Sequence, residues 1–117
     1  MNYLASNFTL GIIGGGQLGK MLCQVTSRLS INTNILDPSD DSPCKNLCSS
    51  FSLGNLMDFK SVYDFGKQCD LVTYEIEHIN VDALEKLENE GIKVYPSSST
   101  LRIIQDKNLQ KIGRAHV

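Results

Sequence analysis

The strongest constraint on the fold of this chain is a glycine-rich turn between an apolar run and a helical pattern. The sequence Gly14-Gly15-Gly16-Gln17-Leu18-Gly19 directly follows the apolar run 8–13. Glycines permit a tight turn, a close approach of a ligand, and close packing of the next helix on the strand. Backbone N–H groups and the dipole at a helix start favour anions. We therefore expect a phosphate site at this turn; a turn that binds nothing is the alternative.

Strand and helix signals alternate along the rest of the chain. A helix after the turn is expected to present one apolar stripe, formed by Leu18, Met21, Leu22, Val25 and Leu29. Asp58 and Asn80 are expected to cap two later helices. Further strands are expected at 34–36, 51–53, 70–74 and 92–95. This alternation predicts an α/β fold, a Rossmann-like doubly wound parallel sheet in three layers, with the strand 8–13 in its interior.

Length and charge narrow the classes of protein and partner. The 117 residues predict one domain, and the net charge of −2 provides no basic face for nucleic acid or an anionic membrane. No apolar run approaches the roughly 20 residues of a membrane span. The first seven residues lack the basic start and apolar stretch of a signal peptide. We expect a cytoplasmic protein with no nucleic-acid or membrane partner.

The four cysteines give a weak signal for metal binding. Cys44 and Cys48 lie in a polar stretch without nearby histidines, which is a poor zinc signature. Cys23 lies on an expected helix and Cys69 lies just before an expected strand. We expect four reduced thiols and no metal site. His78 is isolated and is expected at the surface.

Ligands of an open parallel sheet gather beyond the carboxyl ends of its strands. Asp37 follows one expected strand and could accept hydrogen bonds from ribose hydroxyls, or could simply form a turn before Pro38. Glu75 and Glu77 follow another strand and lie on the same side of an extended chain. They could bind an amine or a cation, or could be solvated. Glu75, which is nearer the strand end, is the better candidate.

Several blocks of the sequence resemble one enzyme family. The stretch 10–22 resembles the opening of N5-carboxyaminoimidazole ribonucleotide synthetase, an ATP-grasp enzyme of purine biosynthesis. Three more blocks resemble it in the same order, at 35–38, 69–77 and 96–107. The combination of Gln17-Leu18 with Tyr74-Glu75-Ile76-Glu77 is more specific than the glycine pattern alone. The resemblance covers residues 8 to 111.

The resemblance implies a specific reaction and a set of contacts. The family carboxylates the amine of 5-aminoimidazole ribonucleotide with bicarbonate, using ATP and Mg²⁺, by way of carboxyphosphate. The ribonucleotide would be contacted by residues at the matching positions, namely Gly16, Gln17, Leu18, Asp37 and Glu75. Its phosphate would lie near the helix start, its ribose near Asp37 and its aminoimidazole amine near Glu75. Family members are commonly dimeric, so a homodimeric parent is implied.

The resemblance also implies a domain organisation. Residues 1–105 would form the pre-ATP-grasp N-terminal domain, and 106–111 would begin the linker into an ATP-grasp region. Lys107 matches a basic position at the ATP-binding boundary, where a cation can pair with phosphates. The Mg²⁺ ligands belong to the ATP-grasp region, so we expect no catalytic residue here and no activity from this fragment alone. Residues 112–117 match one translation of a common sequencing adapter and are expected to be a non-native tail.

Two other functions compete with this reading. An NAD- or FAD-binding Rossmann domain of an oxidoreductase would use the same turn, with Asp37, 18 residues after Gly19, as a ribose-binding acid. That class does not require the block 74–77. A non-catalytic interaction module is the third possibility, and no residue pattern favours it.

Overall fold

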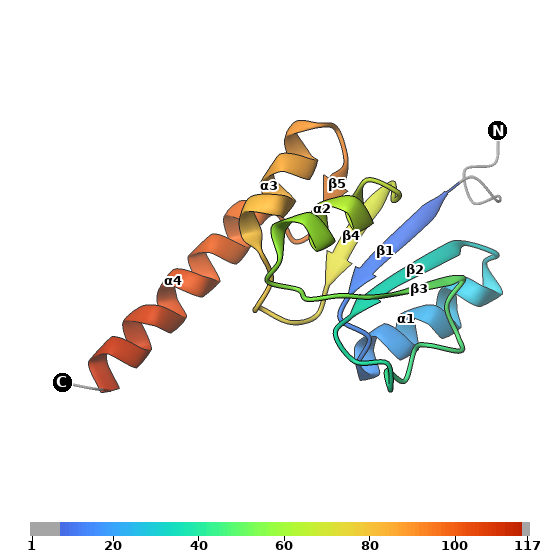
Figure 1. Ribbon diagram of the computed structural model, residues 1–117, viewed down its shortest axis with the longest axis horizontal. Coiled ribbons are helices and arrows are strands. Elements are labelled where there is room, and N and C mark those ends of the chain that lie inside the picture. Colours follow the sequence, from blue (N-terminus) through green and yellow to red (C-terminus); the bar gives the residue numbers. More distant parts are fainter. Residues whose placement is uncertain (1–7, 116–117) are drawn as a thin grey trace.

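A single parallel sheet of five strands forms the centre of the molecule (Figure 1). The computed structural model describes the backbone of residues 8–115 and the side chains of 8–109. The strands are β1 (Thr9–Ile13), β2 (Asn32–Asp37), β3 (Ser50–Leu53), β4 (Leu71–Tyr74) and β5 (Lys93–Val94). Their order in the sheet is β3-β2-β1-β4-β5, and every neighbouring pair is parallel. The predicted doubly wound α/β fold, with β1 in the interior, is confirmed.

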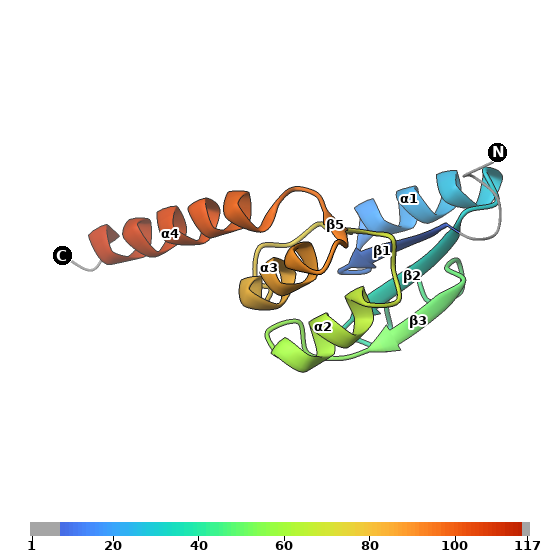
Figure 2. The same ribbon diagram turned by 90° about the horizontal axis from the view of Figure 1, so that it is seen from above.

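Helices cover both faces of the sheet and make three layers. Helix α1 (Gln17–Arg28) covers one face, and α2 (Phe59–Gly66) and α3 (Val81–Asn89) cover the other (Figure 2). Helix α4 (Ser98–Ala115) begins beside α3 and extends away from the sheet. The segment 38–49, which joins β2 to β3, forms turns instead of a helix. None of the helices in the described part of the chain is long and apolar enough to cross a membrane.

The core lies on both faces of β1 because neighbouring residues of a strand point in opposite directions. Ile13 is fully buried and packs with the apolar side chains of α2 and α3, including Leu84 and Leu87. Ile12 points to the α1 side and belongs to a smaller buried cluster with Cys23, Ile35 and Cys44. The carboxyl end of β1 is therefore held from both sides.

Four of the five residues in the predicted apolar stripe of α1 are exposed. Leu18, Met21, Val25 and Leu29 are each about half exposed or more, at 49%, 61%, 50% and 49%. The residues that α1 buries are Gly19, Cys23 and Thr26. These side chains are small, so the helix axis can approach the sheet closely. The apolar stripe lies roughly a third of a turn around the helix from that face.

The predicted caps of the two middle helices are confirmed. The Asp58 carboxylate accepts a hydrogen bond from the Ser61 N–H at 3.0 Å, and the Asn80 side chain accepts one from the Ala83 N–H at 3.0 Å. Gly91 ends α3 with a φ of +94°, a backbone conformation that favours glycine. Strand β5 is shorter than the expected 92–95, and α4 runs through the segment 106–111 without a break.

Candidate functional site

The candidate site lies at the carboxyl edge of the sheet, where the strand order reverses between β1 and β4. The register pairs Ile13 with Leu36 on one side and with Tyr74 on the other. The residue after each strand therefore lies near the same point: Gly14 after β1, Asp37 at the end of β2, and Glu75 after β4. Ligands of open α/β sheets bind in the crevice at this kind of position.

The Asp37 carboxylate contacts the glycine turn directly. Its Oδ2 atom accepts a hydrogen bond from the Gly15 N–H at 2.5 Å, and its Oδ1 atom accepts one from the Ser39 N–H at 2.8 Å. Asp37 thus forms the turn that its position before a proline predicts, and it also reaches the glycine turn. Asp37 is half-buried at the carboxyl edge of the sheet.

The Glu75 carboxylate occupies the start of α1. Its Oε1 atom accepts a hydrogen bond from the Gly16 N–H, and its Oε2 atom accepts one from the Gly19 N–H at 3.3 Å. Together with Asp37, it satisfies three backbone donors of the turn. A phosphate at these donors, as expected from the sequence, would have to displace a carboxylate. The remaining lone pairs of the two carboxylates favour ligands that donate hydrogen bonds, such as hydroxyls and amines.

The close fit of Glu75 against the turn explains why glycines occur there. Gly14 has a φ of +97°, which favours glycine. A Cβ atom on Gly16 would lie 2.9 Å from the Glu75 Oε1 atom, and one on Gly15 would collide with the Ser42 hydroxyl. The backbone of the turn therefore approaches its neighbours more closely than any other residue type allows.

Two residues of the segment 38–49 support the turn and were not predicted. The Ser42 hydroxyl donates a hydrogen bond to the Gly15 carbonyl oxygen at 2.8 Å. The fully buried Cys44 thiol donates one to the Gly16 carbonyl oxygen at 3.6 Å. No local sequence pattern marks either residue, because each contact depends on how the segment folds over the turn.

The remaining predicted site residues lie at two places. Gln17 and Leu18 form the exposed first turn of α1, beside the carboxylates. Lys107 lies on the exposed side of α4, and it makes no ion pair with any residue that the structure describes. The structure therefore brings the carboxylates of Asp37 and Glu75 to the glycine turn that contains Gly16. Lys107 lies on a separate element, α4.

Glu77 has a different role from Glu75. The chain leaves the extended conformation after Tyr74, so the two-residue period of a strand no longer applies. The Glu77 Oε2 atom accepts a hydrogen bond from the Asn108 side chain at 2.6 Å. Glu75 therefore faces the glycine turn, whereas Glu77 is bound to α4.

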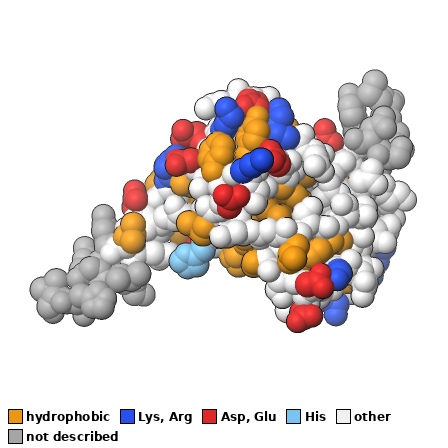
Figure 3. All heavy atoms as spheres, viewed as in Figure 1, with side chains coloured by type: hydrophobic (Ala, Val, Ile, Leu, Met, Phe, Trp, Pro, Cys, Tyr) orange, Lys and Arg blue, Asp and Glu red, His pale blue; other side chains and the backbone are white. Residues whose placement is uncertain are grey.

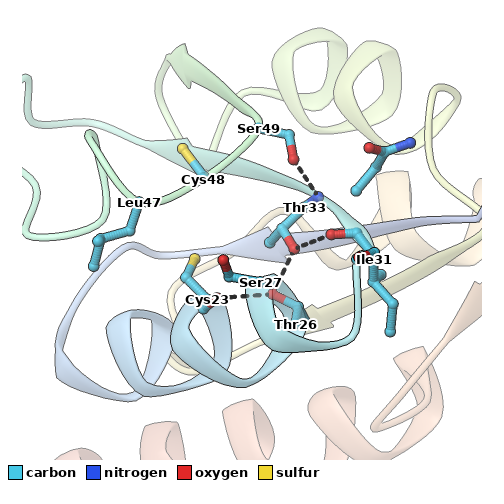
Figure 4. Close-up of a pocket in the computed structure, with 10 residues that line it drawn as sticks. Cys23, Thr26, Ser27, Ile31, Thr33, Leu47, Cys48 and Ser49 are labelled. Carbon is cyan, nitrogen blue, oxygen red and sulfur yellow. Dashed lines mark hydrogen bonds between the residues drawn. The ribbon is translucent and has the colours of Figure 1, made fainter. Parts of the chain in front are cut away.

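One cavity lies at the opposite end of the sheet from Asp37 and Glu75 and has an uncharged lining. A cavity of about 350 Å³ lies between α1 and the start of β2, where Thr26, Thr33 and Cys48 line it with other uncharged residues (Figure 4). The Thr33 hydroxyl donates a hydrogen bond to the Thr26 hydroxyl at 2.7 Å. This cavity lies at the amino end of the strands, away from Asp37 and Glu75. We therefore place the candidate site at the carboxyl edge.

The thiols of this chain are free and poorly ionised. Burial raises the pKa of the Cys23 and Cys69 thiols to about 12, and it also raises the pKa of Cys44 and Cys48. Among the residues that the structure describes, no group of three or more His, Cys, Asp or Glu side chains is arranged to hold a metal ion. His78 is exposed, as its isolated position predicts.

Comparisons with known proteins identify the family of this chain. Residues 8–105 match the family model of the ribonucleotide synthetase preATP-grasp domain. The chain is 45% identical over 104 residues to the chloroplastic phosphoribosylaminoimidazole carboxylase of Vigna aconitifolia, covering 89% of this chain and 19% of that protein.

Two solved structures are similar in fold and sequence. One is the N5-carboxyaminoimidazole ribonucleotide synthetase of Thermotoga maritima, with a TM-score of 0.81 and 42% identity, covering 89% of this chain and 29% of that one. The other is the N5-carboxyaminoimidazole synthase of Aspergillus clavatus in complex with ADP and 5-aminoimidazole ribonucleotide. Its TM-score is 0.74 at 37% identity, with coverage of 92% of this chain and 30% of that one.

The matches cover most of this chain but only part of each relative. The chain spans between about a fifth and a third of the length of these relatives. The family model, in contrast, matches most of the chain, from the residue before β1 into α4. The chain therefore belongs to the family of ribonucleotide synthetase preATP-grasp domains.

Proposed function

We propose that this chain is the N-terminal, substrate-binding part of an ATP-dependent ligase that carboxylates the amine of 5-aminoimidazole ribonucleotide with bicarbonate. The observation that carries the proposal is the convergence of the Asp37 and Glu75 carboxylates on the glycine turn at the strand-order reversal. A related synthase with the same fold forms a complex with ADP and this ribonucleotide. An oxidoreductase domain is disfavoured because the turn donors that would bind a dinucleotide pyrophosphate already hold carboxylates.

The proposal gives a role to Glu75, Asp37, Gln17 and Leu18 of the candidate site. Glu75 accepts a hydrogen bond from the exocyclic amine, which orients the amine and favours the positive charge that develops as it attacks the carboxyl carbon. Asp37 accepts hydrogen bonds from ribose hydroxyls. Gln17 and Leu18 contact the ribonucleotide from the first turn of α1. The ribonucleotide phosphate is then held at a place other than the amides of Gly15, Gly16 and Gly19.

We propose that this chain contributes one contact to ATP, from Lys107 on α4, and none to Mg²⁺. Bound ATP would supply the driving force for activating bicarbonate. The exposed Lys107 ammonium is suited to an ATP phosphate. The described residues contain no cluster suited to Mg²⁺, so we assign the metal ligands to the ATP-grasp region of the parent protein. Our proposal assigns 1–105 to the substrate domain, 106–111 to the start of the connection to that region, and 112–117 to a non-native tail.

The proposal also includes the oligomeric state and the cellular location of the parent protein. We expect a homodimer in the cytoplasm, with small-molecule substrates and no nucleic-acid partner. The mixed charge supports the absence of a nucleic-acid partner, and the four free cysteines support the cytoplasmic location.

The proposal is tested with the complete gene product that contains this chain. ADP formation should require both 5-aminoimidazole ribonucleotide and bicarbonate, and calorimetry should detect binding of the ribonucleotide but not of NAD or FAD. Binding of NAD without binding of the ribonucleotide would favour the oxidoreductase alternative and contradict the proposal.

A further inference from the structure

Three hydrogen bonds connect α4 to the segment that follows β4. The Gln105 side chain donates to the carbonyl oxygens of Glu77 and Ile79 at 2.9 and 3.1 Å. The Asn108 side chain donates to the Glu77 Oε2 atom at 2.6 Å. Gln105 and Asn108 are three residues apart, so they lie on one face of the helix. We call these three residues, Glu77, Gln105 and Asn108, the latch.

The segment held by the latch also carries the site carboxylate. Glu75 lies two residues before Glu77, and its side chain is bound to the amides of Gly16 and Gly19. Ile79 is fully buried, and the Asn80 N–H donates to the Leu56 carbonyl oxygen at 2.8 Å. The segment is thus fixed at both ends, with the latch between them. A shift of α4 along the latch must therefore move the backbone next to Glu75.

The latch is separate from the contacts that dock α4 on α3. Leu101 is fully buried in the main core, and the Arg102 guanidinium contacts Asp82 at 2.7 Å and Glu85 at 3.3 Å. These contacts hold the first part of the helix without involving the segment 75–79. Loss of the latch should therefore leave α4 docked while it frees the segment beside the site.

The helical turn of α4 that carries the latch also carries the position proposed for ATP. Lys107 lies between Gln105 and Asn108 in the sequence, within the same helical turn, and its side chain is exposed. A phosphate bound at Lys107 would act on the helix turn that holds Glu77. Helix α4 extends away from the sheet (Figure 1), and the hydrogen bonds of this turn to the rest of the chain are those with the segment 75–79 among the described side chains.

We propose that Gln105, Asn108 and Glu77 are positioning residues that couple the ribonucleotide site at Glu75 to the ATP-binding turn at Lys107. This inference rests on the proposed function, which assigns a substrate to each end. It predicts that the ribonucleotide changes the affinity for ATP, and that ATP changes the affinity for the ribonucleotide by the same factor. The latch needs an acceptor at residue 77 but not a charge, since an amide oxygen can also accept the Asn108 hydrogen bond.

The test uses the complete protein and calorimetric affinities for a non-hydrolysable ATP analogue, with and without 5-aminoimidazole ribonucleotide. The ratio of the two affinities should be about fivefold or more in the native protein. It should fall to near one in the variant Gln105→Ala/Asn108→Ala. It should keep its native value in Arg102→Ala, which breaks the α3 contact only. A native ratio in the latch variant, or a ratio of one in the native protein, would overturn the inference.

A second measurement tests the latch without any ligand. Hydrogen exchange at the amides of Glu75, Ile79 and Asn80 should be faster in Asn108→Ala, while exchange in α3 should keep its native rate. Unchanged exchange in this segment would overturn the inference even if both substrates bind. Failure of the native protein to bind the ribonucleotide would instead contradict the proposed function, so the two failures are distinguishable.

Discussion

At the scale of single residues, the carboxylates of Asp37 and Glu75 determine what the glycine turn can bind. A glycine-rich turn before a helix is usually open to phosphate because its donors are free. In this chain the donors of Gly15, Gly16 and Gly19 already hold carboxylate oxygens. The charge presented to a ligand is therefore negative, which suits an amine or a hydroxyl.

The contact between Gly16 and Glu75 predicts that substituting Gly16 lowers stability more when the Glu75 side chain is present. Gly16→Ala should destabilise the chain by about 1–3 kcal/mol, because the new Cβ atom would lie 2.9 Å from the Glu75 Oε1 atom. The same substitution in a Glu75→Ala background should cost clearly less. Urea unfolding of the four proteins measures both costs. Equal costs in the two backgrounds would show that Glu75 does not crowd this position.

The raised thiol pKa values predict slow modification of the native chain. Because only thiolates react readily, Cys23 and Cys69, with pKa values of about 12, should react slowly with Ellman's reagent at pH 8. The half-buried Cys48 should react first, and Cys48→Ser should remove that phase. All four thiols should react at once in urea. Rapid reaction of four thiols in the folded chain would contradict this account.

At the scale of elements, local signals predicted the type and order of the elements, but not the packing of α1. The apolar run of β1, the caps at Asp58 and Asn80, and the stop at Gly91 are local features, and each has the predicted role. A helical period reveals an apolar stripe but not what the stripe faces. In α1 the small residues approach the sheet, so the stripe that contains Met21 faces outward.

The packing of α1 predicts opposite effects at neighbouring positions. Met21→Lys should change the free energy of unfolding by less than about 0.5 kcal/mol, because Met21 is 61% exposed. Cys23→Lys should destabilise the chain strongly, since Cys23 is buried in the smaller cluster with Ile12. Thermal unfolding of the two variants compares them. A strongly destabilised Met21→Lys protein would show that this stripe is buried.

The contact between α2 and α3 predicts a dependence on acid. Two hydrogen bonds lower the pKa of Glu90 from about 4.5 to about 2. The larger effect comes from the Tyr63 hydroxyl and the smaller one from the Lys67 ammonium. A carboxyl with a lowered pKa in the folded state stabilises the fold above its unfolded pKa, and this contribution is lost as the pH falls toward 2. Stability measured between pH 5 and pH 2 should fall less steeply in Glu90→Gln and in Tyr63→Phe. An unaltered acid dependence in Glu90→Gln would contradict this assignment.

At the scale of the whole molecule, large hydrophobic side chains remain exposed beyond the crevice. Tyr95 is 74% exposed and Leu109 is 67% exposed, in addition to the outer stripe of α1. Figure 3 shows hydrophobic side chains among charged ones over one face of the molecule. The chain also spans less than a third of the length of each of the two similar solved structures. Both facts agree with our proposal that this domain forms part of a larger enzyme.

The candidate site could be predicted only in part. The fold rule for parallel sheets placed Asp37 and Glu75 at one edge from their positions after strands. The occupation of the turn amides by these carboxylates could not be predicted, because it depends on side-chain reach across three strands. The contacts of Ser42 and of Asn108 also required the folded chain, since each joins residues that are distant in sequence.

The most direct test of the central claim compares two neighbouring carboxylates in the complete protein. Glu75→Gln should lower kcat/KM for 5-aminoimidazole ribonucleotide by about tenfold to a hundredfold, because a charged hydrogen bond contributes about 1.5–3 kcal/mol. ATP binding should stay nearly native. Glu77→Gln should have a much smaller effect, since its amide oxygen can still accept the Asn108 hydrogen bond. A large loss in Glu77→Gln beside native kinetics in Glu75→Gln would contradict the placement of the substrate amine at Glu75.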